Sequence, residues 1–394
     1  MFAHLFKLIW NKRKQNFLLM VEIFVSFLVL FAVFTMMVYY YRNYKKPLGF
    51  DYENVWVINY NNTLQTNNND SLSLFYETLR QTIKAMPQVK DLTFSTTNIP
   101  FSMSMSQSGF DDNGRHFNGI DWYFVDDDYK NVLNAKILEG RWFNKQDAVL
   151  KNRPVVINAS LKEKLFGDGM AIGKLFGGGK PTDKMLVVGV VQDIKQFGDY
   201  TNGGLAVFNR ADTASYRSLS RMLIKVSPDA NATFEGRLYK TVSNYMKNAN
   251  IGIDHLTNTR KRVNLLYLTP VIVLLVVAGF LTINVTLGLF GVLWYNISKR
   301  RAEIGLRRAV GASGNAVSWQ LVAEALVLAT ISLLAGCFLA VQFPLLRIFD
   351  LPAIVYIKAL ILAILFIYLL VLLCSLYPGK QAAAVYPAVA LHED

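Results

Sequence analysis

The 394-residue sequence has few of the side chains on which catalytic, disulfide-bonded and metal sites depend. Its two cysteines, Cys337 and Cys374, lie within apolar runs, which excludes a disulfide framework and a cysteine-rich zinc site. Four scattered histidines form no HExxH pair, and no Gly-x-Ser-x-Gly elbow is present. We therefore expect no catalytic residue and no metal site in this chain.

Phosphate-binding and calcium-binding loops are also missing. The glycine-rich stretches 167–174 and 175–182 lack the glycine, four residues, Gly-Lys spacing of a phosphate loop, and turns are the simpler explanation of their glycines. Three adjacent carboxylates at 126–128 would point to opposite faces of a strand, or be solvated on a loop. This chain is thus expected to bind no cofactor of its own.

Acidic residues are outnumbered by basic ones, 28 against 41, which gives a formal net charge of +13. No basic stripe is interleaved with stacking aromatics, so nucleic-acid binding is not expected. The basic residues cluster beside long uncharged runs, and apolar residues make up 53% of the sequence. This pattern is typical of a membrane protein whose basic clusters set topology and contact lipid.

Four apolar runs are long enough to cross a bilayer, which takes ~20 residues. The first span and its stalk occupy 17–41, and the lack of a small-residue cleavage site predicts an uncleaved anchor rather than a signal peptide. Near its start, Glu22 is interpreted as an interfacial carboxylate. The later segments are a stalk and second span at 259–297, a third span at 315–343, a turn at 344–352 and a fourth span at 353–376.

The distribution of lysine and arginine sets the expected orientation. Basic residues crowd the tail 1–16 and the loop 298–314, and such residues concentrate on the cytoplasmic side. Both termini, including the tail 377–394, are therefore predicted to be cytoplasmic. Segment 42–258 is predicted to be extracytoplasmic, although it begins with basic residues, because the charge rule weakens for long segments.

Segment 42–258 has the patterns of a mixed α and β domain. A strand at 54–60 precedes an amphipathic helix at 70–86, whose apolar stripe is formed by Leu72, Phe75, Leu79 and Ile83. A β–α–β unit opens the segment, another closes it, and a strand-rich lobe at about 96–212 is inserted between them. The predicted fold is an α-helical membrane protein with four transmembrane helices, plus an α+β two-lobed extracytoplasmic domain inserted between helices 1 and 2.

The basic loop 298–314 carries more than charge. On a helix over 299–310, one stripe is apolar and consists of Ala302, Leu306, Ala309 and Val310. Gly311 is expected to end this helix, and Ser313 or Asn315 to begin the next. Gly305 costs about 1 kcal/mol relative to alanine within a helix. Close approach to another backbone would explain this glycine, whereas a helix lying on anionic lipid is an equal alternative.

Several ordered motifs resemble one known family. The stretch SKRRAEIGLRRAVGAS at 298–313 closely resembles the cytoplasmic signature of FtsX/MacB-like ABC transporter permeases. Segments 319–340 and 376–394 are similar to the third span and the closing segment of that family. Within the large domain, the matching motifs are LNAKILEGRWF, RPVVINASLKEKLFG, AIGKLF and LVVGVVQD, so the resemblance covers essentially the whole chain.

The resemblance implies a non-catalytic membrane subunit of a type VII ABC system in the bacterial inner membrane. Its implied partners are a cytoplasmic ATPase subunit that binds ATP and Mg, a second permease subunit that is identical or a paralogue, and membrane lipid. The family also allows a periplasmic adaptor or an outer-membrane component. ATP-driven motion would pass through the stalks to the MacB-type domain for export or extraction of a substrate. The substrate class stays open: lipoprotein, drug or peptide.

The loop after the second span is the predicted ATPase-coupling site, with residues Arg300, Arg301, Glu303, Ile304, Gly305, Leu306, Arg307, Arg308 and Gly311. Gly288 and Gly291 are predicted positions of close packing within the membrane. For Glu324, a bond to a neighbouring helix and an interfacial position are equal alternatives. A competing hypothesis is a regulatory transmembrane scaffold or sensor that controls a periplasmic partner, such as a cell-wall hydrolase, without transport.

Overall fold

A computed structural model describes residues 13–61, 68–103, 106–178, 183–212, 215–346, 349 and 351–383. The chain forms two compact units. The α/β unit is Asn43–Tyr267, and the helical unit combines Met1–Arg42 with Leu268–Asp394. Most of the predicted basic tail 1–16, and residues 384–394 of the predicted C-terminal tail, lie outside the described residues.

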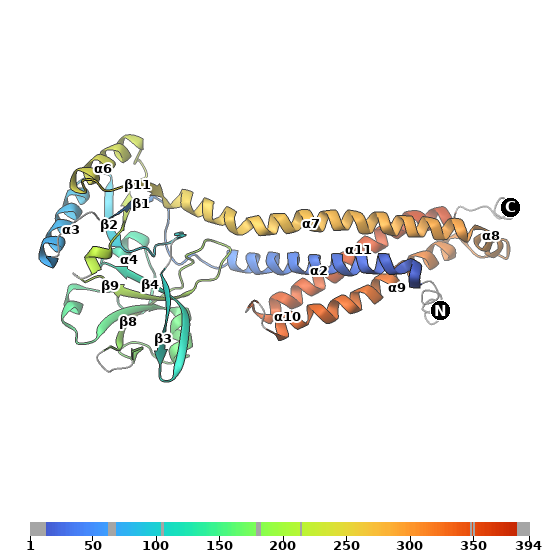
Figure 1. The fold of residues 1–394 in the computed structure, drawn as a ribbon, viewed down its shortest axis with the longest axis horizontal. Coiled ribbons are helices and arrows are strands. Elements are labelled where there is room, and N and C mark those ends of the chain that lie inside the picture. Colours follow the sequence, from blue (N-terminus) through green and yellow to red (C-terminus); the bar gives the residue numbers. More distant parts are fainter. Residues whose placement is uncertain are drawn as a thin grey trace. The chain divides into compact units, whose positions relative to one another are not determined.

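The first lobe of the α/β unit is a split β–α–β arrangement built from the two ends of the segment (Figure 1). Its sheet order is β11-β1-β10-β2, with antiparallel neighbours throughout. The two β–α–β units predicted from the sequence are therefore the two halves of one lobe. Its elements are β1 (Val55–Tyr60), α3 (Asn69–Lys84), β2 (Val89–Ser95), β10 (Arg221–Val226), α6 (Ala232–Tyr245) and β11 (Ile251–His255).

The second lobe lies between β2 and β10 in the chain, and its strands fall within the predicted range 96–212. It extends the sheet of the first lobe, in the order β4-β9-β6-β8-β5, and does not form a separate sheet. The junction is a single registered pair, Ser95 with Val125. Its elements are β3 (Gln107–Asp112), β4 (Arg115–Val125), α4 (Tyr129–Leu133), β5 (Ile137–Gly140), η1 (Lys145–Val149), β6 (Arg153–Asn158), α5 (Ala159–Phe166), β7 (Leu175–Phe176), β8 (Met185–Val191), β9 (Leu205–Arg210) and η2 (Ser215–Ser218).

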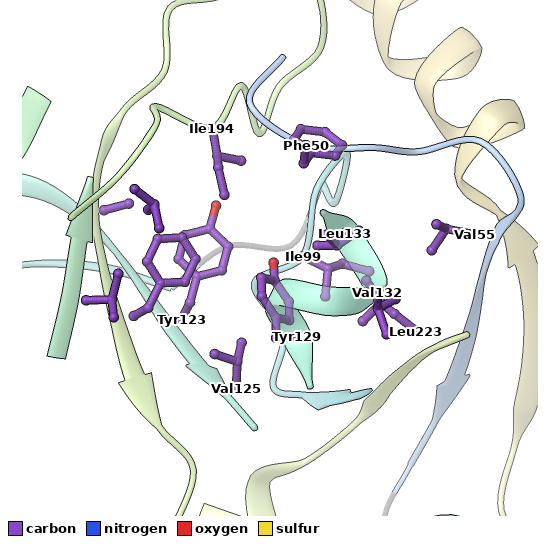
Figure 2. Packing of buried hydrophobic residues seen from close by; sticks show 14 of the residues in the cluster. Phe50, Val55, Ile99, Tyr123, Val125, Tyr129, Val132, Leu133, Ile194 and Leu223 are labelled. Atoms are coloured by element: carbon purple, nitrogen blue, oxygen red, sulfur yellow. The ribbon is translucent and has the colours of Figure 1, made fainter. Parts of the chain in front are cut away.

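One hydrophobic core is shared by both lobes. Register partners across the sheet place their side chains on the same face, because side chains alternate along a strand. Val57 pairs with Leu223, Tyr123 with Phe208, and Phe208 with Val156, and all belong to one buried cluster. Figure 2 shows Tyr123 and Leu223 of this cluster packed around the same space as Tyr129 of α4 and Ile194. This shared packing makes the two lobes one structural unit.

Helices cover the opposite face of the sheet. Between Val55 and Val57, Trp56 points away from the shared core and packs with α3 and α6 in a second cluster. On α3, three of the four predicted stripe residues are buried, but Phe75 is only partly so. Tyr76 takes the buried position instead, because its ring packs edge-on against Phe94 of β2 at a centroid distance of 5.0 Å.

The helical unit contains the membrane-spanning part of α2 (Arg13–Tyr44) and of α7 (Leu256–Lys299). The remaining helices are α8 (Arg301–Ala309), α9 (Gly314–Ala340), α10 (Gln342–Leu345) and α11 (Ala353–Ala383). Four helices of the described chain are long and apolar enough to cross a membrane: Phe17–Tyr44, Leu256–Lys299, Gly314–Leu345 and Ala353–Ala382. At ~1.5 Å per residue, α7 is ~66 Å long, about twice the ~30 Å hydrocarbon core.

Small residues mark where these helices approach one another closely. A Cβ atom on Gly336 of α9 would collide with the ring of Phe27 on α2. A Cβ on Gly379 of α11 would lie 2.6 Å from the hydroxyl of Ser318 on α9. Helix pairs in lipid gain mainly from such close packing, since lipid is as apolar as their side chains. The two glycines therefore position α2 and α11 against α9.

Asn158 links three segments of the α/β unit through one fully buried side chain. Its Oδ1 accepts from the backbone N–H groups of Leu161 and Ala206, at 3.3 and 2.9 Å. Its Nδ2 donates to Asp193 Oδ1 and Gly204 O, at 2.6 and 2.7 Å. Asn158 thus caps α5, whereas the Ser160 hydroxyl and backbone N–H both bind Asp193.

We expect Asn158→Ala to lower the free energy of unfolding of the α/β unit by about 2–4 kcal/mol, because it removes an N-cap and leaves buried backbone groups unpaired. Urea unfolding of the full chain in detergent, followed by tryptophan fluorescence, measures the change. Asn68→Ala is the matched control, since Asn68 caps α3 at an exposed site and its loss is expected to cost about 1 kcal/mol. Equal losses would contradict a linking role for Asn158.

Candidate functional site on a short charged helix

The backbone breaks its helical course at Arg300, between α7 and α8. Arg300 has φ −107° and ψ 16°, so α7 ends at Lys299 and α8 begins at Arg301. A continuous helix over 299–310 was the expectation, and it is wrong at this residue. At this break, the side chain of Arg300 binds carboxylates on two different helices.

Arg300 joins α8 to α9. Its Nη1 donates to both carboxylate oxygens of Glu324, at 3.1 and 3.3 Å, and its Nε donates to Glu303 Oε2 at 3.0 Å. The side chains of Arg300 and Glu324 are each only 14% exposed. Hydrogen bonding to Glu303 raises the pKa of Arg300, and the nearby charge of Glu324 acts in the same direction. Of the two alternatives for Glu324, the structure thus places it in contact with a neighbouring element.

A second arginine completes the network. Arg307 Nη2 donates to Glu303 Oε1 at 2.6 Å, in the favourable i, i+4 order, and its Nη1 donates to Gln320 Oε1 at 2.9 Å. Gln320 Nε2 donates in turn to Glu324 Oε1 at 3.2 Å. Glu303 therefore pairs with two of the basic side chains of the loop, and α8 is held to the first turns of α9 by a closed set of polar contacts.

The buried face of α8 consists of Ile304 and Gly305. Ile304 packs with Val317 and Leu321 of α9 and with Ala382 of α11. Gly305 lies beside Ile304 on this buried face.

The predicted apolar stripe faces outward. Ala302, Leu306, Ala309 and Val310 are all exposed, and the two largest side chains, Leu306 and Val310, are 55% and 82% exposed. The stripe exists as predicted, but it is not the face that holds α8 to the rest of the chain.

The ends of the site follow the predicted signals. Gly311 adopts φ +104°, a conformation that L side chains rarely adopt, and α8 ends just before it. Ser313 begins α9, with its hydroxyl accepting from the Ala316 N–H at 3.2 Å. Of the two remaining arginines, Arg301 is exposed and Arg308 is partly buried.

Gly288 and Gly291, the two glycines predicted to pack closely within the membrane, differ in how near other residues lie to them. A Cβ on Gly288 of α7 would lie 2.6 Å from Glu22 Oε2 and 3.6 Å from Leu19, so α2 and α7 lie close together at this point. Gly291 has no neighbour within 4 Å of such a Cβ among the described residues. The carboxylate of Glu22 thus lies against a helix backbone.

The carboxylates at 126–128 are paired with arginines. Arg80 binds Asp126 and Asp128, at 2.5 and 2.8 Å, and Arg210 binds Asp127 at 2.7 and 2.8 Å. Burial raises the pKa of Asp126, and the Arg80 charge acts in the opposite direction. Across the described ranges, no group of three or more histidine, cysteine, aspartate or glutamate side chains is arranged to hold a metal ion.

Two family models match the chain. The MacB-like periplasmic core domain matches residues 17–238, and the FtsX-like permease C-terminal region matches residues 271–387. The chain therefore belongs to the FtsX/MacB-like family of ABC transporter permeases. The resemblance found in its sequence motifs is confirmed.

Individual relatives cover different shares of their own length. The uncharacterized ABC transporter permease YvrN of Bacillus subtilis (strain 168) is 25% identical over 79% of this chain and 78% of its own. The macrolide export ATP-binding/permease protein MacB 1/2 of Paracoccus denitrificans (strain Pd 1222) is 27% identical over 56% of this chain, which spans 33% of that relative. The crystal structure of the periplasmic region of MacB from Actinobacillus actinomycetemcomitans is 17% identical, with a TM-score of 0.39, over 54% of this chain and 94% of its own.

We expect Glu324→Gln to speed hydrogen exchange of the α8 backbone roughly tenfold, because hydrogen bonds to a charged group contribute about 1.5 kcal/mol. Exchange over residues 300–313, measured by mass spectrometry on the full chain, tests this. Glu139→Gln removes the ion pair to Lys162, at 2.5 Å in the α/β unit, and is expected to leave this exchange unchanged. Unchanged exchange in Glu324→Gln would mean that the packing of Ile304 alone holds α8.

Proposed function

We propose that this chain is the membrane subunit of an ABC transporter or mechanotransmission complex. Its α8 binds a separate ATPase subunit, and motion of α7 and α2 carries the effect of ATP hydrolysis to the α/β unit. The observation that carries the proposal is the geometry of α8. Burial of Ile304 and the contact of Arg300 with Glu324 hold this helix in place. Its apolar residues Leu306 and Val310 are exposed on the other side.

A protein partner suits this surface better than lipid does. Binding of an amphipathic helix to a membrane scales with its buried apolar area and with its unpaired basic charge. On α8 the large exposed apolar side chains are Leu306 and Val310, which is a small area. Glu303 and Glu324 together pair with Arg300 and Arg307, which lowers the attraction to anionic lipid. Membership of an ABC permease family supplies the partner class, a cytoplasmic ATPase that binds ATP and Mg.

The proposed orientation follows from charge. The basic loop 298–314 is placed in the cytoplasm with both termini, and the α/β unit on the outer side of the bacterial inner membrane. The length of α7 supports this arrangement, because a helix of ~66 Å exceeds the bilayer core by about half its length. The first turns of α7 contribute Leu256 and Val263 to the core of the α/β unit. A continuous helix thus leads from that core to the residue next to α8.

The working complex is proposed to contain two such membrane subunits, identical or paralogous, with two ATPase subunits. A periplasmic adaptor or an outer-membrane component is a further proposed partner. The process is export or extraction of a substrate, and the α/β unit is proposed to meet that substrate or its carrier. The name of the MacB relative from Paracoccus denitrificans combines ATP-binding and permease functions, which supports ATPase coupling in this family.

We expect Leu306→Asp to reduce the amount of ATPase retained by the tagged full chain at least tenfold. Burying a new carboxylate at the centre of a small apolar contact costs more than the ~1.4 kcal/mol that corresponds to tenfold. Retention is measured on complexes purified from native membranes, as ATP hydrolysis per membrane subunit together with mass spectrometry of the bound chain.

Leu74→Asp is the matched control, since Leu74 is an exposed leucine on α3, 70% accessible, in the α/β unit. It is expected to keep wild-type ATPase retention. Glu303→Lys is a less direct test, because Glu303 binds Arg300 and Arg307 and its loss would release α8 itself. If Leu306→Asp retains the ATPase at the wild-type level, the coupling role of this face is wrong.

A further inference from the structure

The loop between β8 and β9, residues 192–204, contains a lysine buried to 2% exposure. Lysine is almost never fully buried unless its ammonium group is paired. The Lys195 Nζ donates to three backbone carbonyl groups: those of Asn43, Lys46 at 2.6 Å and Asp199 at 3.2 Å. Asn43 lies in the last turn of α2, and Lys46 follows shortly after its end.

Lys195 therefore acts as a C-terminal cap for α2. The last carbonyl groups of a helix have no partner within the helix, and the helix dipole favours a cation at this end. Further contacts join the same loop to the end of α2. Asn43 Nδ2 donates to Tyr200 O at 3.0 Å, and the rings of Tyr44 and Tyr200 stack at a centroid distance of 6.0 Å. The buried lysine is thus one of several contacts that join the β8–β9 loop to the end of α2.

The same loop holds the beginning of α7 through Asp199. Arg260 donates to both carboxylate oxygens, at 3.1 and 2.7 Å, and Asn264 Nδ2 donates to Oδ2 at 2.8 Å. Asn264 Oδ1 also accepts from the Asp199 N–H at 2.9 Å. Arg260 and Asn264 are one turn apart on α7, so the single carboxylate of Asp199 binds two residues on one face of the helix. Gly198, at φ +93°, makes room, because a Cβ there would collide with Asn264.

The loop is itself fastened to the core of the α/β unit. Its two ends are joined to the buried Asn158, which donates to Asp193 and to Gly204 O. Ile194 is buried in the shared core, where Figure 2 shows it near Phe50. In the middle of the loop, Gln196 O accepts from the Phe101 N–H at 2.8 Å. The loop is therefore a fixed part of the core to which both helix ends are attached.

The contacts of loop 192–204 with α2 and α7 exceed what is needed to connect β8 to β9. Loops in compact domains have a median length of about 4–6 residues, and this one is longer. Lys195 reaches Asn43, which is 152 positions away in sequence, and Asp199 reaches Arg260, which is 61 positions away. The polar groups of the loop are thus directed at two helices that are remote from each other in sequence.

We propose that Lys195 and Asp199 form a clasp that locks the ends of α2 and α7 to the β8–β9 loop, so that movement of either helix reaches the core of the α/β unit through this loop. Both are positioning residues, since each acts through the helix that it holds. The inference rests on the proposed function in one respect, because it takes movement of α2 and α7 as the effect of ATP hydrolysis that reaches the α/β unit.

The first test needs no ATPase. Spin labels are attached at Lys45→Cys and Lys261→Cys, beside the ends of α2 and α7, in the full chain in nanodiscs with both native cysteines changed to serine. Double electron–electron resonance gives the distance distribution between them. A clasp predicts a narrow distribution that at least doubles in width with Asp199→Asn and with Lys195→Met.

Asp127→Asn is the matched control, because Asp127 binds Arg210 in the same bidentate manner, at 2.7 and 2.8 Å, away from both helix ends. It is expected to leave the width unchanged. Asp199→Asn keeps the size of the side chain, so it is informative even if Lys195→Met fails to fold. An unchanged width in Asp199→Asn overturns the clasp.

The second test uses the complex with the ATPase. Hydrogen exchange over residues 43–50 and 192–204 is compared without nucleotide and with ATP plus vanadate. The nucleotide-dependent change is expected in the wild type and in Asp127→Asn, and it is expected to be lost in Asp199→Asn while ATPase retention stays at the wild-type level. Persistence of the change in Asp199→Asn overturns the clasp. If the wild type retains no ATPase, the proposed function fails, and the spin-label widths still decide the clasp.

Discussion

Packing of the first turns of α7 into the core of the α/β unit is the contact on which the proposed mechanism depends. Leu256 and Val263 are buried in the same cluster as Val57, Tyr123 and Phe208, which come from both lobes of the sheet. Because the core is close-packed, a shift of these turns cannot be absorbed locally. The first turns of α7 are thus part of the α/β unit.

An arginine at each end of α7 binds a carboxylate that is remote in sequence. Near its beginning, Arg260 is held by Asp199, and just past its end, Arg300 is held by Glu324. Each pair is partly buried, so solvent screens it less than an exposed pair. The same device thus fixes α7 to the β8–β9 loop at one end and to the first turns of α9 at the other.

Local patterns were the reliable part of the prediction. Period-two and period-3.6 patterns found the strands and helices of the first lobe, and the capping signals at Gly311 and Ser313 lie at the observed helix boundaries. These features depend on residues within a few positions of one another. The separate short helix after the second span was predicted, but its contact with Glu324 was not, because Glu324 lies 24 positions from Arg300 and looked like an isolated carboxylate in an apolar span.

The sequence alone determined the four apolar spans, the mixed domain between the first two, and the family, because each rests on composition, periodicity or ordered motifs. The tertiary structure decided that both lobes share one sheet, that Ile304 rather than the apolar stripe packs α8 against α9 and α11, and that Lys195 caps α2. Those outcomes depend on which distant segments meet. The physical reason is that a buried charge or a glycine acquires its role from the groups packed against it, and those groups are far away in the chain.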